Sequence, residues 1–136
     1  NLCPMGWHVP TNIEWTTLVN FLINNGYNYD GTSSGNKIAK SLAATTLWNT
    51  SSTPGATGNT DYPAYRNKTG FAAFPGGYRY RIGSFFGDFG SYGTWWSTTE
   101  DGSTGAWSRT IAYDKSSLDS FSNNKKDGFS VRCVKD

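Results

Sequence analysis

The two cysteines of this sequence stand at its opposite ends, as Cys3 and Cys133 in a chain of 136 residues. If they pair, the bond ties the first strand of the fold to the last and closes the molecule on itself, which restricts both the fold and the compartment. A redox pair and a pair of metal ligands are the other uses of two cysteines. Structural zinc sites favour closely spaced Cys or His ligands, which this sequence lacks.

The length fits one domain, residues 1–136, with one core. Only 36% of the residues are apolar but 16% are aromatic, so we expect a core built from a few large rings and not from many Leu and Ile residues. Sixteen glycines, with many Asn, Ser and Thr residues, indicate long turns and loops. Two cysteines in a chain of this composition favour a secreted or cell-surface protein.

The charges of the chain are few and scattered, with a net charge of +2. The one basic run, Lys125-Lys126, is too short to make a nucleic-acid-binding stripe, so no nucleic-acid partner is predicted. No run of about 18 apolar residues occurs, so direct membrane insertion is not predicted either.

A capping box marks the start of the clearest element. Thr11 is a suitable N-cap and Glu14 follows three residues later, after Pro10 has ended the preceding strand. A helix is therefore predicted over 12–25, and Gly26 is a natural residue to end it. Apolar residues recur at helical spacing and predict one core-facing stripe: Trp15, Leu18, Val19 and Leu22.

The order of elements predicts an α+β fold, with helices first and antiparallel strands after them. A shorter helix is expected at 36–44. The long loop at 49–68 that follows is of a kind that is usually functional or disordered in a compact domain. Alternating residues between turn-forming glycines predict four further strands, at 77–82, 95–97, 106–113 and 129–134.

Patterns for catalysis are weak in this sequence. The segment 31–35 matches the G-x-S-x-G pattern, but no buried strand precedes it, and we interpret it as a flexible loop. His8, the only histidine, is expected to be structural, with a ring nitrogen bonded to the backbone. Each aspartate has a turn explanation as good as a role in a carboxylate pair, so we predict that the protein is not an enzyme.

Glu100 and Asp101 are neighbouring acids in a predicted loop at a strand end. Carboxylates in such a loop bind calcium or accept hydrogen bonds from sugar hydroxyls. Asp114 and Asp119 bracket another turn and have the same potential. Solvated turn acids are the alternative interpretation, and the EF-hand pattern is absent. No cofactor is therefore predicted, while a structural calcium ion remains an open alternative.

Aromatic residues in the loops give the stronger indication of function, because a domain of this size cannot bury all of them. Tyr and Trp side chains suit binding sites, and beside Asn, Asp and Ser they suit carbohydrate stacking. The alternative is that these rings anchor the loops to the body of the domain. The residues predicted to contact a ligand are Tyr62, Tyr65, Phe85, Phe86, Tyr92, Glu100 and Asp101.

Four segments occur in the order typical of a known family. They read CPMGWHVPTNIEWTTL at 3–18, GFAAFPGGYR at 70–79, WWSTTE at 95–100 and GFSVRCV at 128–134. Over nearly its whole length the chain resembles the Fibrobacter succinogenes major paralogous domain family (FISUMP). The resemblance implies a surface or secreted protein of Bacteroidetes or of relatives of Fibrobacter, many of which are lipoproteins.

Segments 8–15, 75–77 and 128–131 are also similar, more distantly, to the framework of the formylglycine-generating-enzyme group. That similarity implies a C-type-lectin-like fold, with two helices on a twisted antiparallel sheet, long loops and adjacent terminal strands. Together with the flanking motifs it implies a disulfide between Cys3 and Cys133. The group's active-site cysteines precede the closing strand, where 106–127 contains none, so its oxidase activity is not expected. The sugar-binding calcium motifs of lectins are absent as well.

These observations together predict an extracellular, non-enzymatic recognition domain. It would be adhesin-like and would bind a surface glycan or a protein ligand. The alternative is a structural subunit of a surface fibre or pilus-like assembly, in which the chain would form a homo-oligomer. Low charge and abundant Tyr, Asn and Gly are compatible with that alternative.

Overall fold

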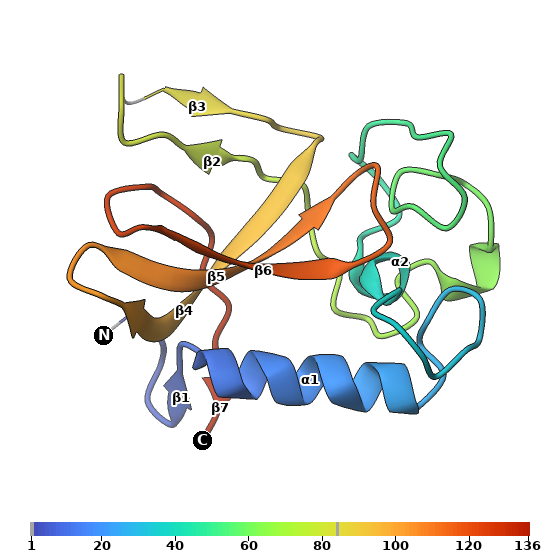
Figure 1. Cartoon of the computed structure of the whole chain (residues 1–136), viewed down its shortest axis with the longest axis horizontal. Helices are drawn as coiled ribbons and strands as arrows, with labels where there is room; N and C mark the ends of the chain where they lie inside the picture. Colours follow the sequence, from blue (N-terminus) through green and yellow to red (C-terminus); the bar gives the residue numbers. More distant parts are fainter. Residues whose placement is uncertain (1, 84) are drawn as a thin grey trace.

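The computed structural model describes residues 2–83 and 85–136, and Figure 1 shows its helices beside short antiparallel sheets. In chain order the elements are β1 (Trp7–His8), α1 (Asn12–Asn24), α2 (Ala39–Leu42), a 3₁₀ helix (Pro63–Tyr65), β2 (Tyr78–Arg79), β3 (Phe86–Gly87), β4 (Tyr92–Asp101), β5 (Gly105–Ala112), β6 (Leu118–Asn124) and β7 (Val134–Lys135). Within the described ranges the strands pair as β1–β7, β2–β3 and β4–β5–β6, all antiparallel. This mixture of helices and antiparallel strands agrees with the predicted α+β class. No helix in that part of the chain is long and apolar enough to cross a membrane.

Helix α1 begins where the capping box predicts. Thr11 Oγ1 accepts a hydrogen bond from the Glu14 amide at 3.2 Å, and the Glu14 carboxylate accepts one from the Thr11 amide at 2.8 Å. The helix ends at Asn24, one residue earlier than predicted, and Gly26 follows with φ 75°, which a residue without a Cβ adopts easily. The predicted stripe faces the core, with Trp15, Val19 and Leu22 buried and Leu18 partly buried.

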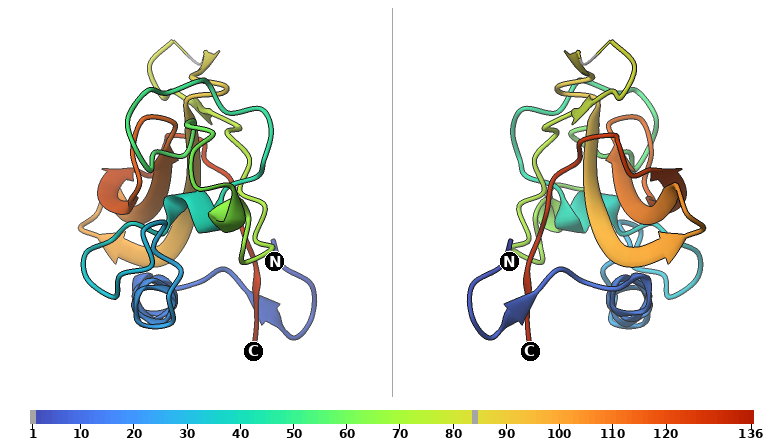
Figure 2. Two further views of the ribbon diagram at one scale, coloured as in Figure 1. Left: turned by 90° about the vertical axis from the view of Figure 1, so that its right-hand side faces the viewer. Right: turned by 90° about the vertical axis from the view of Figure 1, so that its left-hand side faces the viewer.

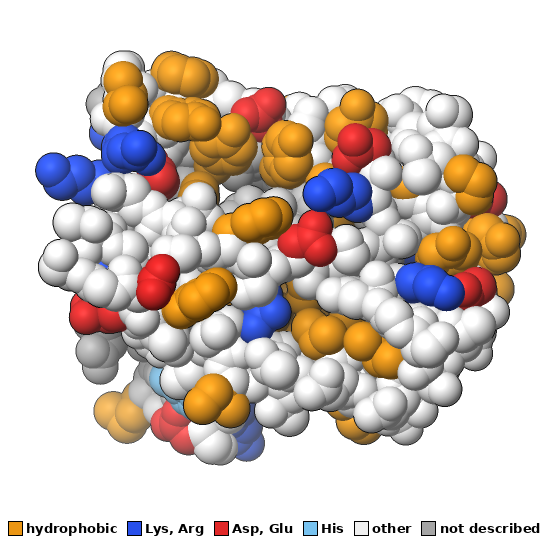
Figure 3. All heavy atoms as spheres, in the orientation of Figure 1, with side chains coloured by type: hydrophobic (Ala, Val, Ile, Leu, Met, Phe, Trp, Pro, Cys, Tyr) orange, Lys and Arg blue, Asp and Glu red, His pale blue; other side chains and the backbone are white. Residues whose placement is uncertain are grey.

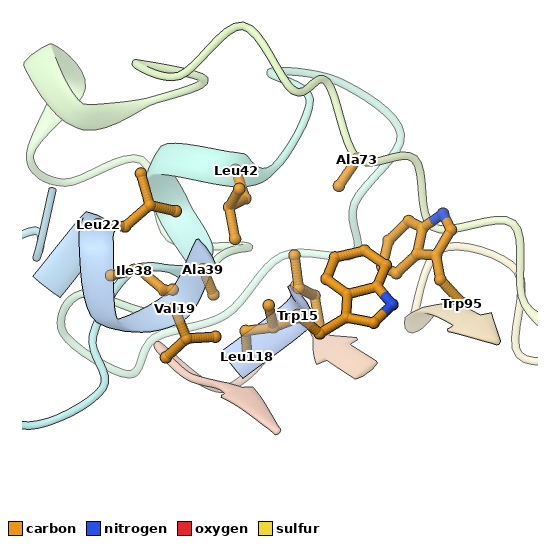
Figure 4. Close-up of a cluster of buried hydrophobic side chains, with 10 residues drawn as sticks. Trp15, Val19, Leu22, Ile38, Ala39, Leu42, Ala73, Trp95 and Leu118 are labelled. Atoms are coloured by element: carbon orange, nitrogen blue, oxygen red, sulfur yellow. The ribbon is translucent and has the colours of Figure 1, made fainter. Parts of the chain in front are cut away.

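The core lies between α1, α2 and the inner face of the β4–β5–β6 sheet (Figure 4). The figure shows Leu22 and Val19 of α1 beside Ile38 and Ala39, with Leu118 entering from β6. At one end of the core, the ring of Phe71 lies 6.2 Å from Trp15 and 5.9 Å from Trp95, centroid to centroid. Large rings therefore fill only this end of the core. Each such ring contributes roughly 1.5–3 kcal/mol when fully buried. The expectation of a core of rings in place of many Leu and Ile residues is wrong for the rest, because the other buried members are aliphatic: Val19, Leu22, Ile38, Ala39, Leu42, Ala73, Ile111 and Leu118.

Helix α2 is shorter than the predicted helix over 36–44. The Asn36 side chain pairs with the Leu118 backbone, accepting from its amide at 3.2 Å and donating to its carbonyl at 2.9 Å. Ala39 also donates its amide to the Ser116 carbonyl at 2.9 Å. These bonds attach the start of the segment to the turn before β6, so that only Ala39–Leu42 is helical.

The three-stranded sheet differs from the prediction in its length and edges. β5 matches the predicted strand at 106–113 to within one residue at each end. β4 runs over ten residues, where only 95–97 was predicted, with an irregularity between Trp96 and Glu100. Glu100 and Asp101 consequently lie in a strand and not in a loop, which corrects their predicted setting. β6 was not predicted, because Leu118 is its only buried residue.

The predicted strands at 77–82 and 129–134 are wrong in extent. β2 pairs at only two residues, and the closing strand β7 begins at Val134. Residues 128–130 instead make single bridges, from Gly128 to Arg79 and from Ser130 to Trp95. This segment therefore runs between β2 and β4 and connects the small β2–β3 sheet to the larger sheet.

Cys3 and Cys133 form a disulfide, with Cα atoms 5.9 Å apart and a sequence separation of 130. This confirms the predicted pairing, and in the bonded state neither sulfur is a free thiolate that could ligate a metal ion. Beside the bond, β1 and β7 pair through Trp7 with Lys135 and His8 with Val134. Figure 2 shows from both sides that these two strands lie next to each other below the sheet.

Candidate functional site

A groove of about 380 Å³ opens between β2 and the outer face of the β4–β5–β6 sheet. In Figure 3 the surface is hollowed below the hydrophobic side chains that gather at the upper left, over β2 and β3. This volume lies in the range of small-molecule sites, about 300–1,000 Å³. The aromatic residues that line the groove are Tyr78, Tyr80, Tyr92, Phe121 and Phe129, and the polar ones are Arg81, Asp88, Thr94, Thr110, Asn123 and Asp127.

Tyr78 is the centre of the aromatic wall. Its ring centroid lies 5.1 Å from that of Tyr80, 6.3 Å from Tyr92 and 6.0 Å from Phe129. Tyr80 in turn stacks on Phe85 at 5.4 Å with nearly parallel planes. Contacts of this kind contribute about 0.5–1.5 kcal/mol each beyond burial, so the wall is held in place by its own rings.

Gly77 fixes how closely this wall approaches β3. Its φ is +64°, and a Cβ placed on it would lie 2.1 Å from the Gly87 carbonyl oxygen. Only glycine fits both conditions. The Gly77 amide also donates to the Tyr92 carbonyl at 2.8 Å, which attaches the start of β2 to the start of β4. Gly77 therefore positions Tyr78 over the sheet.

One end of the groove is polar and already organised. The Asp127 carboxylate accepts hydrogen bonds from the Arg81 amide at 3.0 Å and from Arg81 Nη1 at 3.2 Å. Its side chain is only 9% exposed, whereas that of Arg81 is 39% exposed. The Asp127 carboxylate is therefore fixed in place and holds the Arg81 guanidinium, which presents N–H groups to the groove.

The Tyr78 hydroxyl is held as a neutral donor. Burial, followed by hydrogen bonds with Asp88 and Tyr80, raises the pKa of Tyr78 above its usual range. Asp88 adopts φ +60°, and its carbonyl accepts the Ser91 amide at 3.0 Å and the Tyr92 amide at 3.2 Å. This turn places the Asp88 carboxylate beside the phenol.

The sheet face supplies further polar groups. Asn123 Nδ2 donates to Ser108 Oγ at 2.8 Å, which orients the amide and leaves its carbonyl oxygen as an acceptor. The Thr94 and Thr110 hydroxyls lie 3.2 Å apart and bond to each other. The groove thus carries donors and acceptors between aromatic rings.

Of the seven residues predicted to bind a ligand, Tyr92 lines the groove and Phe85 supports its edge through Tyr80. Phe86 lies on β3 next to Phe85, with 81% of its surface exposed. Tyr62 and Tyr65 lie in and beside the 3₁₀ helix, where Tyr62 packs on Tyr29 at 4.8 Å. The predicted residues therefore do not form one site.

Glu100 and Asp101 lie at the far end of β4 from Tyr92. Glu100 accepts a hydrogen bond from Lys125 Nζ at 2.8 Å, which lowers the pKa of its carboxyl. The described residues contain no group of three or more His, Cys, Asp or Glu side chains arranged to hold a metal ion. Neither acid is placed near the groove.

His8 does not bond to the backbone as predicted. Its Nδ1 lies 2.6 Å from an Asp136 carboxylate oxygen and its Nε2 lies 2.8 Å from a Glu14 oxygen. The Asp136 and Glu14 hydrogen bonds raise the pKa of His8. The histidine therefore connects β1, α1 and the last described residue, away from the groove.

The segment at 31–35 is organised by a buried side chain and is not a nucleophile elbow. Asn28 Nδ2 donates to the carbonyl groups of Thr32 at 2.8 Å and of Gly35 at 3.1 Å. Asn28 Oδ1 accepts the Lys37 amide at 2.9 Å. The interpretation of this segment as a loop is confirmed. The loop was expected to be flexible, whereas these hydrogen bonds to Asn28 attach it to the rest of the fold.

Most residues of the groove were not predicted as binding residues. Two pairs carried a usable signal, since Tyr78 and Tyr80, like Phe121 and Asn123, alternate on one face of an extended segment. Asp127 and Phe129 give no such signal, because bridges from residues 128–130 to β2 and β4 bring them to the groove.

Comparison with known proteins adds one finding. The family model of the Fibrobacter succinogenes major domain matches residues 1–135. No curated protein and no solved structure matches the chain.

Proposed function

Because the chain belongs to the Fibrobacter succinogenes major domain family, we propose that it is a non-enzymatic recognition domain of a secreted or cell-surface bacterial protein. Its ligand would be a surface glycan or a protein, bound in the groove between β2 and the sheet. The Cys3–Cys133 disulfide supports the extracytoplasmic placement, since such bonds persist in oxidising compartments.

The observation that carries this proposal is the groove itself. It combines five aromatic rings with polar groups that are each fixed by a partner inside the protein. Binding sites typically pair apolar walls with a few positioned polar groups. The only histidine is bonded to two carboxylates elsewhere, which supports recognition over acid–base catalysis at this site.

We also propose that the fold is C-type-lectin-like and distantly related to that of formylglycine-generating enzymes. The paired terminal strands, α1 beneath the sheet and the long loops at the other end support this (Figure 1). An experimental structure checks it, by superposition of α1 and β4–β6 on a C-type lectin. A different strand connection would overturn it.

Binding to immobilised glycans and cell-surface proteins tests the recognition function. The labelled chain is expected to bind at least one of them, and Tyr80→Ala should weaken that binding. Phe21→Ala is the matched control, because Phe21 is an exposed ring on α1, away from the groove. No binding at all, or equal effects of both substitutions, would overturn the proposal. Tyr62→Ala and Glu100→Gln test the predicted contacts outside the groove in the same assay.

A structural subunit is the second candidate, because exposed apolar residues gather around the β2–β3 sheet. Ile82, Phe85, Phe86 and Phe89 are each more than half exposed. Surfaces of this kind often mark protein–protein contacts. A fibre subunit would self-associate through more than about 1,000 Å² of surface, and Phe86→Ser would return it to a monomer. Sedimentation at high concentration checks this, and a monomeric wild-type chain contradicts it.

A further inference from the structure

The groove has features that separate one ligand class from another, and this inference rests on the recognition function proposed above. Its walls are side chains on the face of a sheet. The backbone groups of β5 are paired on both sides, with β4 and with β6. A peptide that binds by strand addition needs a free strand edge, which the floor of this groove does not offer.

The polar groups of the groove keep unused hydrogen-bonding capacity. Arg81 bonds the Asp127 carboxylate through Nη1, so its other guanidinium N–H groups do not bond Asp127 and are able to donate to a ligand. Asn123 offers a carbonyl oxygen, and the Asp88 carboxylate lines the groove as a further acceptor. Hydroxyl groups both donate and accept, so a ligand dense in hydroxyls satisfies all three.

The aromatic rings of the groove suit the apolar part of a ligand that is rich in hydroxyl groups. Tyr80 is 37% exposed and Phe121 is 45% exposed, and both line the groove from opposite walls, on the β2 side and on β6. The C–H groups of a sugar ring form a flat apolar face of the kind that stacks on aromatic rings. The volume of about 380 Å³ accepts a short stretch of a chain and not a long one.

The charges of the groove select among sugars. Asp127 is paired with Arg81, whereas the Asp88 carboxylate has no lysine or arginine partner among the described residues. The lining therefore carries one uncompensated negative charge. An anionic sugar would approach that charge and be repelled.

We propose that the groove between Tyr80 and Phe121 binds a neutral pyranose sugar, with Arg81, Asn123 and Asp88 contacting its hydroxyls, and that it discriminates against acidic sugars. No metal ion takes part in this recognition.

Calorimetric titration with named probes tests the proposal. Neutral probes are maltotriose, xylotriose, lactose and chitotriose, acidic probes are 3′-sialyllactose and digalacturonic acid, and a polyproline peptide represents protein ligands. We expect at least one neutral sugar to bind, equally with and without EDTA, and the acidic probes to bind at least tenfold more weakly. Phe121→Ala and Tyr80→Ala should each weaken binding at least tenfold, and Phe21→Ala should leave it unchanged.

The outcomes separate this inference from the broader proposal. If the peptide or a surface protein binds and the groove substitutions weaken it, while no sugar binds, the sugar assignment is wrong and the recognition function stands. If acidic sugars bind best, or EDTA abolishes binding, the assignment is also wrong. If no probe or surface ligand binds, or the groove substitutions have no effect, both proposals fall. The NMR spectrum of each variant confirms that it is folded.

Discussion

Lys40 shows how one residue organises a long loop. Its side chain is only 1% exposed, and its ammonium donates to the carbonyl groups of Asn59 at 2.5 Å and Asp61 at 3.0 Å and to Asp61 Oδ1 at 2.8 Å. These three bonds use all the protons of the ammonium group. The other Asp61 oxygen accepts the Gly55 amide at 2.7 Å. A buried cation thus holds the predicted loop at 49–68 in one conformation.

Substituting Lys40 with Met should therefore destabilise the fold strongly. The change leaves the Asp61 carboxylate and two carbonyl groups without their donor, and breaking a buried pair typically costs about 3–5 kcal/mol. Urea unfolding with the disulfide intact measures the loss. Lys37→Met is the control, because its ion pair with Asp30 is exposed and should contribute far less. Equal losses in the two variants would contradict the role of Lys40.

The pKa of His8 should lie above its usual value of 6.5, because the Asp136 and Glu14 carboxylates stabilise the imidazolium. NMR titration measures it without ambiguity, since the chain has one histidine. Glu14→Gln should lower the pKa towards 6.5, while a glutamine still completes the capping box. A wild-type pKa at or below 6.5 would show that these contacts do not form in solution.

The same contacts set a pH dependence of stability. A raised pKa of His8 means that its contribution is complete below pH 6.5 and is lost as the pH rises through the folded-state pKa. The Thr11 amide, followed by His8, lowers the pKa of Glu14 below 4.5. The Glu14 contribution is therefore complete above pH 4.5 and is lost as the pH falls through its folded-state pKa. The free energy of unfolding should be larger at about pH 5.5 than at about pH 8, and Glu14→Gln should reduce the difference.

At the scale of the elements, the start of α1 depends on Thr11. Its hydroxyl accepts the Glu14 amide, so Thr11→Ala should lower the free energy of unfolding by about 1 kcal/mol. Thr17→Ala is the control, because Thr17 is exposed within the same helix and alanine is the better helix former. Urea unfolding of both variants measures the difference. A loss as large for Thr17→Ala would show that the cap contributes nothing specific.

The elements that could be predicted from the sequence are those with local signals. The capping box and the apolar stripe of Trp15, Val19 and Leu22 predicted α1 closely, and clean alternation predicted β5. β6 was missed because it buries only Leu118 and turns Phe121 towards the groove. The closing strand was predicted too long, because its first residues cross between two sheets.

At the scale of the whole molecule, the disulfide restricts the unfolded chain more than any other single contact. In the chain-entropy model, closing a loop of this length contributes about 5 kcal/mol. The double variant Cys3→Ser with Cys133→Ser should therefore unfold at a much lower urea concentration than the oxidised wild type. Reduction of the wild type is the second measurement and should give the same shift. An unchanged midpoint would mean that the β1–β7 pair forms equally well without the bond.

The groove could not be predicted as a whole, because it depends on contacts between distant segments. Tyr78, Tyr92, Phe121 and Asp127 come together because Gly77 bridges to β4 and residues 128–130 bridge to β2 and β4. The loop aromatics Tyr62 and Tyr65 have the composition of a binding site but lie in a separate part of the fold. Local sequence indicates which side chains suit binding, whereas the sheet connections decide which of them meet.

The position of the disulfide also has a mechanical consequence. A pulling force applied on the outer sides of Cys3 and Cys133 would pass through one covalent bond and bypass every strand and helix between them. The oxidised molecule would then behave as an inextensible link. The reduced molecule would lengthen by on the order of 400 Å as its chain straightens. On a surface exposed to flow, the groove would keep its shape under load for as long as that bond stays oxidised.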